Sequence, residues 1–334
     1  MRKIIVPVGY MGSGSSAVTD LISEFDGVNN EYGEFEYVFL HCPDGVFDLE
    51  DKLLKGNNAL RSDEAVRTFL SRMKKLYNKK LWWVGDYKNK IGNNFYNRSV
   101  DYIDELINFK LDNYWYMQEN TNLVMFIKLI IRKLVYILSL KKIELKKPLL
   151  YSGMNLAYPT EKEFYNKTSK YIYDIFKMID DGNSDLLLDQ LVLPHNLHRV
   201  NKYFKNDVKF IVVDRDPRDI YILNKYFWSK NNEGVPYSHD VDEFCEQYKK
   251  IRELEKCSDD KNILRIQFED MIYKYEETKE KIINFLNYNE RNHLNIKRRF
   301  NPEKSKNNVR LYLRDEYLEE SKIIEKKLEK YLYK

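Results

Sequence analysis

The segment from residue 4 to residue 22 constrains the fold more than any other part of the chain. It begins with an apolar, β-prone run at residues 4–8, passes through a turn with Gly12 and Gly14, and continues as a helical pattern at residues 17–22. A strand, a glycine-rich turn and a helix in this order direct free backbone N–H groups and the positive end of the helix dipole to one spot. The sequence therefore predicts an α/β fold with an anion-binding turn.

The spacing of this turn is that of a phosphate-binding P-loop, with four residues between Gly9 and Gly14. The next residue is Ser15, where a nucleotidase loop has the lysine that neutralises the β- and γ-phosphates. The turn is therefore poorly suited to ATP or GTP hydrolysis, although backbone N–H groups and serine hydroxyls can still hold a phosphate. Those hydroxyls belong to Ser13, Ser15 and Ser16. The alternative interpretation is an ordinary strand–helix turn rich in small residues.

Length and charge limit the protein class. The chain has 334 residues, which suits one α/β domain over residues 1–334 that carries an insertion. The 56 basic and 52 acidic residues leave a net charge of +4, too balanced to indicate a nucleic-acid partner.

The cysteines and the first apolar run bear on the compartment. Cys42, Cys245 and Cys257 are scattered without metal-ligand spacing. The first apolar run breaks at a glycine after five residues, which is too short for a signal peptide. We therefore expect no metal site and a reducing cytoplasm.

Three further strands are expected at residues 185–188, 208–213 and 262–267. In parallel α/β sheets, ligands bind beyond the carboxyl ends of the strands. Asp189 follows the first of these strands, and Arg215 follows the second beside a predicted helix N-terminus. The arginine predicts a second anion site.

Other acid–base candidates have weaker local patterns. Glu34 and Glu36 alternate with apolar residues, so as part of a strand they would share one face. They could act as a general base, but the local pattern alone favours a solvated strand edge. His195 and His198 follow Asp189 in a polar loop and helix, where a histidine is more often structural than catalytic.

Residues 43–180 are expected to form a mainly helical insertion, and residues 123–140 are its most apolar part. Lys128, Arg132 and Lys133 lie in the middle of this stretch and argue against a membrane span. Two interpretations remain: an interfacial helix that contacts anionic lipid through residues 123–147, or a core helix whose lysines reach the surface. The sequence alone favours the core helix.

Four motifs appear together in a characteristic order along the chain. They are the turn at residues 12–16, the strand end at residues 212–219, the aromatic-Glu-Asp-Met sequence at residues 268–271, and the basic loop at residues 301–308. Together they resemble the sulfotransferases that use 3′-phosphoadenosine 5′-phosphosulfate. This resemblance implies a three-layer, P-loop-like fold with a central parallel sheet flanked by helices.

The resemblance also implies roles for individual residues around the donor and its product, adenosine 3′,5′-bisphosphate, without a metal. The turn would hold the 5′-phosphosulfate, Arg215 the 3′-phosphate, and Phe268 would lie near the adenine, while Asn224 and the basic loop would supply further donors. The implied donor-binding residues are Gly12, Ser13, Gly14, Ser15, Ser16, Arg215, Asn224, Phe268, Lys304 and Lys306.

Two features of the resemblance concern the chemistry. Glycan-modifying members place a catalytic glutamate shortly after the first helix, which ranks Glu34 first as the base, then Asp189, then His195. Gly12 stands where the family usually has a cation, and this role could pass to another residue. The candidates for it are Arg218, Lys304 and Lys306.

The function implied is sulfuryl transfer to a hydroxyl of a glycan or glycolipid. The resemblance leans toward bacterial surface polysaccharide or a lipid-linked sugar, and the protein would then be cytoplasmic, in peripheral contact with the inner face of the membrane through residues 123–147. Two alternatives remain open: a non-catalytic glycan- or nucleotide-binding protein on the same fold, and a P-loop kinase or nucleotide hydrolase.

Overall fold

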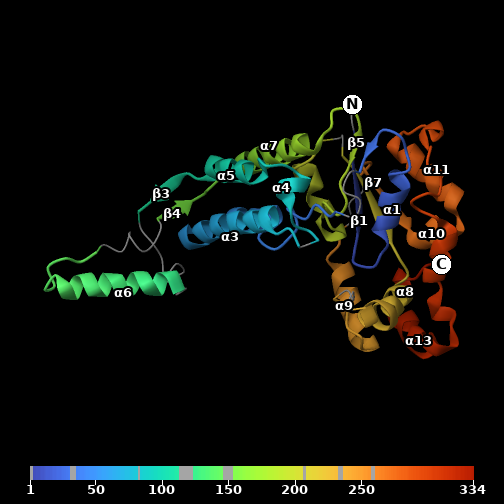
Figure 1. The fold of residues 1–334 in the computed structure, drawn as a ribbon. Helices are drawn as coiled ribbons and strands as arrows, with labels where there is room; N and C mark the ends of the chain where they lie inside the picture. Colours follow the sequence, from blue (N-terminus) through green and yellow to red (C-terminus); the bar gives the residue numbers. More distant parts are fainter. Residues whose placement is uncertain are drawn as a thin grey trace.

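The structure is a computed structural model that describes residues 3–30, 35–81, 83–112, 123–145, 153–205, 208–231, 236–256 and 260–334. Its centre is a five-stranded parallel sheet in the order β2-β5-β1-β6-β7 (Figure 1). The strands are β1 (Ile4–Gly9), β2 (Val28–Asn29), β5 (Asp185–Leu187), β6 (Val208–Asp214) and β7 (Ile263–Gln267). A parallel sheet with helices on its faces confirms the predicted α/β class.

Side chains of the strands alternate between two cores, as the period of two requires. Ile5 points to the face covered by α1 (Ser15–Ile22), α10 (Phe268–Tyr273) and α11 (Tyr275–Leu286). Ile4, Val6 and Val8 point to the opposite face and join the core of the insertion helices. The molecule therefore has helices, sheet and helices in three layers.

The insertion is mainly helical, as predicted, among the residues described. Its helices extend from the sheet as an arm, which continues as a two-stranded antiparallel ribbon and ends in α6 (Figure 1). The elements are α2 (Val46–Leu54), α3 (Ala59–Asn78), α4 (Tyr87–Lys90), α5 (Phe95–Leu106), β3 (Phe109–Leu111), α6 (Leu123–Leu138), β4 (Met154–Leu156) and α7 (Glu161–Ile179).

A third apolar cluster lies outside the two cores that cover the sheet. Its helices are α8 (Pro217–Ile222), the π-helical segment Leu223–Trp228, α9 (Val241–Glu253) and α13 (Leu318–Lys327). In this cluster, α8, the helix after β6, packs against α13 near the C-terminus. The shorter pieces include the 3₁₀ helix Pro194–Lys202 and α12 (Pro302–Ser305), which lies in the predicted basic loop.

The segment at residues 35–40 differs from its prediction, because it forms no strand. The backbone N–H of Tyr37 donates to the Asp189 carbonyl at 2.9 Å, and that of Val38 donates to the Tyr87 hydroxyl at 2.9 Å. Val38, Phe39 and Leu40 are all buried, so the apolar–polar alternation is not used as a sheet face. Local packing in the insertion core outweighs the two-residue period here.

The helix α6 contradicts the favoured prediction of a core helix. Most of its large apolar side chains are exposed, from Leu123 to Leu138. A run of apolar residues alone cannot distinguish a buried helix from one that lies on the surface, because both need the same composition.

Candidate functional site

The predicted site residues come together because each follows the carboxyl end of a parallel strand. The turn at residues 10–14 follows β1, Asp189 follows β5, Arg215 follows β6, and Phe268 follows β7. Parallel strands end at one edge of a sheet, so these four segments converge there.

The turn after β1 has the geometry of an anion cradle. Gly12 and Gly14 have φ angles of 80° and 89°, in the left-handed region that glycine adopts without strain. No acceptor within the described part of the chain pairs with the backbone N–H groups of Gly14, Ser15 or Ser16. The buried Ser13 Oγ also has no hydrogen-bond partner there. These donors at the start of α1 fit an anionic group such as a phosphate or sulfate ester.

Two aromatic rings make glycine necessary in this turn. A Cβ on Gly14 would lie 2.5 Å from the ring of Phe268, and one on Gly12 would lie 2.9 Å from the ring of Trp228. The close approach links the turn to the start of α10 on one side and to the π-helical segment on the other. Trp228 had not been identified from the sequence, because no local pattern relates it to the turn.

Arg215 connects the motifs with its own guanidinium group. It is 5% exposed, and its Nη1 donates to the Gly12 carbonyl at 3.1 Å while Nη2 donates to the Asn308 carbonyl. The group lies 4.5 Å from the centroid of the Phe268 ring. Its buried Nε has no partner among the described residues. Burial lowers the pKa of Arg215 from its usual value. Its Nε–H is left to donate to a further anion.

Carboxylates hold the segment around Arg215 in place. Asp216 caps α8 by accepting from the Arg218 backbone N–H at 2.9 Å, and it also binds the Arg218 guanidinium at 2.7 Å. Asp219 accepts from the backbone N–H groups of Arg310 and Leu311, at 2.8 Å each. Burial raises the pKa of Asp219 to about 6. The residues directly after the basic loop are thereby tied to the helix that follows Arg215.

A second group of polar residues lies beside the turn on the β5 side. Gln190 Nε2 donates to Ser15 Oγ at 2.8 Å, which brings the end of β5 against the start of α1. Asp189 is buried, and its backbone carbonyl anchors the residue after Glu36. Burial, together with the charge of Asp189, raises the pKa of Glu36 to about 7. Gln190 had not been identified from the sequence, although its position directly after Asp189 was a usable signal.

The remaining base candidates are placed differently. Glu34, ranked first from the sequence, lies outside the described residues. The ring of His195 stacks on that of Tyr10 in the turn, with centroids 6.2 Å apart. Burial lowers the pKa of His195 from its usual value, so its neutral form is favoured at neutral pH.

The other residues predicted to bind the sulfuryl donor have different surroundings. Lys304 and Lys306 are exposed in the loop whose Asn308 carbonyl binds Arg215, and Lys306 pairs with Glu303 at 2.7 Å. Asn224 is fully buried and donates to the Tyr237 carbonyl at 3.1 Å. Among the described residues, no group of three or more His, Cys, Asp or Glu side chains could hold a metal ion.

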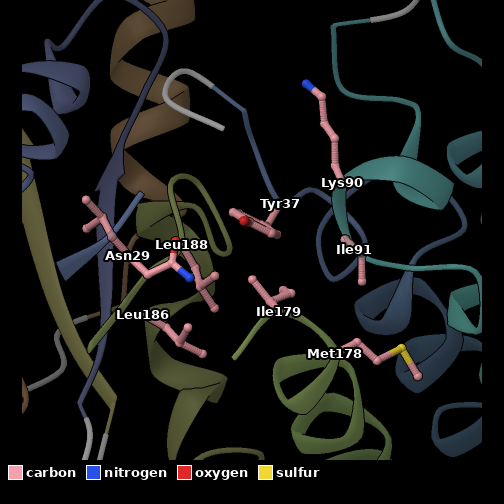
Figure 2. Close-up of a pocket in the computed structure, with 9 residues that line it drawn as sticks. Asn29, Tyr37, Lys90, Ile91, Met178, Ile179, Leu186 and Leu188 are labelled. Atoms are coloured by element: carbon pink, nitrogen blue, oxygen red, sulfur yellow. The ribbon is translucent and has the colours of Figure 1, made fainter. Parts of the chain in front are cut away.

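A small cavity of about 60 Å³ borders the β5 side of the site (Figure 2). Tyr37 and Leu188 line it, and they neighbour Glu36 and Asp189 in sequence. Ile179 and Met178 of the arm close the side that faces the insertion (Figure 2). Its volume is well below the ~300–1,000 Å³ of ordinary ligand pockets, so it forms at most the inner end of an acceptor site.

A model of the family described as the sulfotransferase family matches residues 43–291, which is most of the chain. The chain belongs to the sulfotransferase family. This confirms the family and the enzyme class that the motifs predicted. The matched range contains Asp189, Arg215 and Phe268 and leaves the turn after β1 outside, so the turn is assigned on its geometry and motif spacing.

Several solved sulfotransferase structures are similar to this one. The sulfotransferase domain from the curacin biosynthetic pathway is 12% identical, covers 98% of both chains and has a TM-score of 0.39. The sulfotransferase domain of the Synechococcus PCC 7002 olefin synthase is 10% identical, with 98% of this chain and 93% of that chain covered and a TM-score of 0.40. A sulfotransferase of Mycobacterium avium is 11% identical, with 99% and 76% covered and a TM-score of 0.36. No protein of curated function matches the chain.

Proposed function

We propose that this sulfotransferase transfers a sulfuryl group from 3′-phosphoadenosine 5′-phosphosulfate to a hydroxyl of a glycan or glycolipid. The observation that carries the proposal is the position of Arg215, which binds the Gly12 and Asn308 carbonyls and stacks on Phe268. The Arg215 side chain thereby joins the glycine-rich turn, the basic loop and the aromatic motif. A donor with two separate phosphate groups would need all three close together. The donor supplies an activated sulfuryl group whose leaving group is a phosphate.

The chain's own groups divide the binding of this donor between two anion sites. The N–H groups of residues 14–16 and the Ser13 hydroxyl have no partners within the described residues and suit the 5′-phosphosulfate. Arg215 Nε suits the 3′-phosphate. Preorganised donors of this kind stabilise negative charge that develops on the leaving phosphate.

Glu36 and Asp189 are the carboxylates that we assign to the proton transfer, with Glu34 and His195 as the other candidates. A pKa of about 7 lets Glu36 accept a proton from a hydroxyl at neutral pH and release it afterwards. The acceptor oxygen forms the new bond to sulfur, the sulfur–phosphate oxygen bond breaks, and its electron pair leaves with adenosine 3′,5′-bisphosphate. Positioning and electrostatics supply most of the rate enhancement, as in phosphoryl transfer.

The glycan or glycolipid nature of the acceptor is supported by the motifs. The loop at residues 301–308 is similar to that of bacterial and glycan-modifying members, and residues 34–36 have the spacing of the glutamate found in heparan-type members. The small cavity lined by Tyr37 and Leu188 has a volume of only about 60 Å³, so only one end of an acceptor would enter it.

Calorimetry on the full chain tests the donor assignment. We expect adenosine 3′,5′-bisphosphate to bind without Mg²⁺ and more tightly than ATP with or without Mg²⁺. Arg215→Ala should weaken this binding by ~2–5 kcal/mol, because a buried charge pair loses one partner. Arg215→Lys keeps the charge and should recover part of the loss.

Arg314→Ala serves as the control, because Arg314 is exposed and lies outside the four motifs. It should bind like the parent protein. Equal binding by the parent and by correctly folded Arg215→Ala would refute the site, and preference for Mg²⁺–ATP would favour the kinase alternative.

A further inference from the structure

The helix α6 lies at the far end of the arm, apart from the sheet and its covering helices (Figure 1). Its apolar side chains are unusually open to solvent for a helix of this composition. Exposed fractions reach 55% for Phe126, 50% for Leu134, 55% for Ile137 and 79% for Leu138. An apolar surface of this kind normally marks an interaction site.

The exposed apolar side chains are concentrated on one face of the helix. At roughly 100° per residue, seven of them fall within an arc of about 120°. They are Leu123, Phe126, Ile127, Ile130, Leu134, Ile137 and Leu138. Lys128, Arg132 and Lys133 fall outside this arc. The helix therefore has one apolar face and one cationic face.

The chain after α6 covers the cationic face and leaves the apolar face open. Leu140 and Lys141 turn the chain with positive φ angles, and the Ile143 backbone N–H donates to Ser139 Oγ at 2.9 Å. Arg132 then donates through Nε to the Leu145 carbonyl at 3.1 Å. The returning segment, residues 139–145, packs on the side opposite the apolar arc.

We propose that α6 and its returning segment lie in the plane of an anionic lipid surface. The apolar arc would enter the acyl boundary, and the cations would lie at the level of the headgroups. At 1.5 Å per residue the helix is ~24 Å long, shorter than the ~30 Å hydrocarbon core. No helix in the described parts of the chain is long and apolar enough to cross a membrane.

Charge decides between lipid and a second copy of the chain. Residues 123–143 contain five cations and no acidic residue, and Glu144 is already paired with Arg132. Two copies packed through their apolar arcs would leave Lys128, Lys133, Lys141 and Lys142 uncompensated, because residues 123–143 of the other copy supply no carboxylate. Anionic headgroups neutralise them instead, each basic residue near the surface contributing to binding.

Vesicle flotation of the full chain tests this proposal. We expect binding to phosphatidylcholine vesicles that contain phosphatidylglycerol, and weaker binding to phosphatidylcholine alone. Ile130→Glu with Leu134→Glu should lower the partition coefficient by ~100-fold or more, because it places charges where apolar side chains would enter the lipid. Lys128→Gln with Lys133→Gln should reduce binding to the anionic vesicles only.

The control is Leu254→Glu with Leu313→Glu, which changes two exposed leucines of the main body in the same way. It should bind vesicles like the parent. The proposal is overturned if the parent does not bind vesicles, or if the variant with Ile130→Glu and Leu134→Glu binds them as well as the parent does. A parent dimer that the α6 variant dissociates, without vesicle binding, would identify a second copy as the partner. All variants should still bind adenosine 3′,5′-bisphosphate, so this test is independent of the donor assignment.

Discussion

At the scale of single residues, the environment of Glu36 determines what its carboxyl group can do. Burial and the nearby Asp189 raise its pKa from the usual 4.5 to about 7. The folded protein therefore binds a proton here that the unfolded chain releases at lower pH. Stability from this group is full below pH 4.5 and is lost as the pH rises through about 7.

Glu36→Gln tests this proton affinity without any knowledge of the acceptor. At pH 8 we expect the variant to have a free energy of unfolding ~1–2 kcal/mol higher than the parent, after discounting for partial exposure. At pH 4 the two should agree. Urea denaturation at several pH values measures the difference. The exposed carboxylate variant Glu319→Gln should follow the parent at every pH, and a constant offset for Glu36→Gln would contradict the assigned pKa.

At the scale of elements, the β1–turn–α1 unit depends on its neighbours for its shape. Gly14 and Gly27 both have positive φ angles, 89° and 78°. A Cβ on Gly14 would meet the Phe268 ring at 2.5 Å, whereas a Cβ on Gly27 would have nothing within 4 Å. A side chain at either position would strain the backbone, but only one at residue 14 would also crowd Phe268 at the start of α10.

We expect Gly14→Ala to cost ~1–3 kcal/mol of unfolding free energy more than Gly27→Ala, because only the first is overpacked. Chemical denaturation of both variants measures the difference. In a Phe268→Ala background the extra cost at residue 14 should disappear. Equal losses for the two glycine variants in the parent background would show that Phe268 does not shape the turn.

At the scale of the whole molecule, the arm and the sheet share one apolar core. A polar cluster fastens them together. The buried Glu50 of α2 accepts from the Tyr203 hydroxyl and, at 2.7 Å, from the Tyr165 hydroxyl of α7, and it pairs with Arg199 at 3.2 Å. Arg199 also pairs with Asp51 at 2.8 Å. We therefore expect the arm and the sheet to unfold as one domain.

Arg199→Ala should lower the free energy of unfolding by about 2–4 kcal/mol, because it leaves a buried carboxylate with only its tyrosine partners. Lys55→Ala removes an exposed pair with Asp51 and should cost at most ~1 kcal/mol. Fluorescence and circular dichroism should give coincident denaturation curves for the parent. Two separate transitions would show that the arm and the sheet are separate domains.

Local patterns were sufficient where a residue's role depends on its own strand or turn. The strands at residues 4–8, 185–188, 208–213 and 262–267 were all predicted within two residues, as were Asp189 and Arg215 at their ends. The segment at residues 35–40 was predicted wrongly, because its partners lie in distant loops and in the insertion core.

The sequence by itself determined the class of fold, the family and the order of the motifs, because each rests on short-range spacing of glycine, charge and apolar residues. Only the tertiary structure decided which residues meet. It placed Arg215 between Gly12 and Phe268, brought Glu36 to Asp189, and left α6 exposed at the end of the arm. Burial and contact depend on residues far apart in the chain, and no local pattern contains that information.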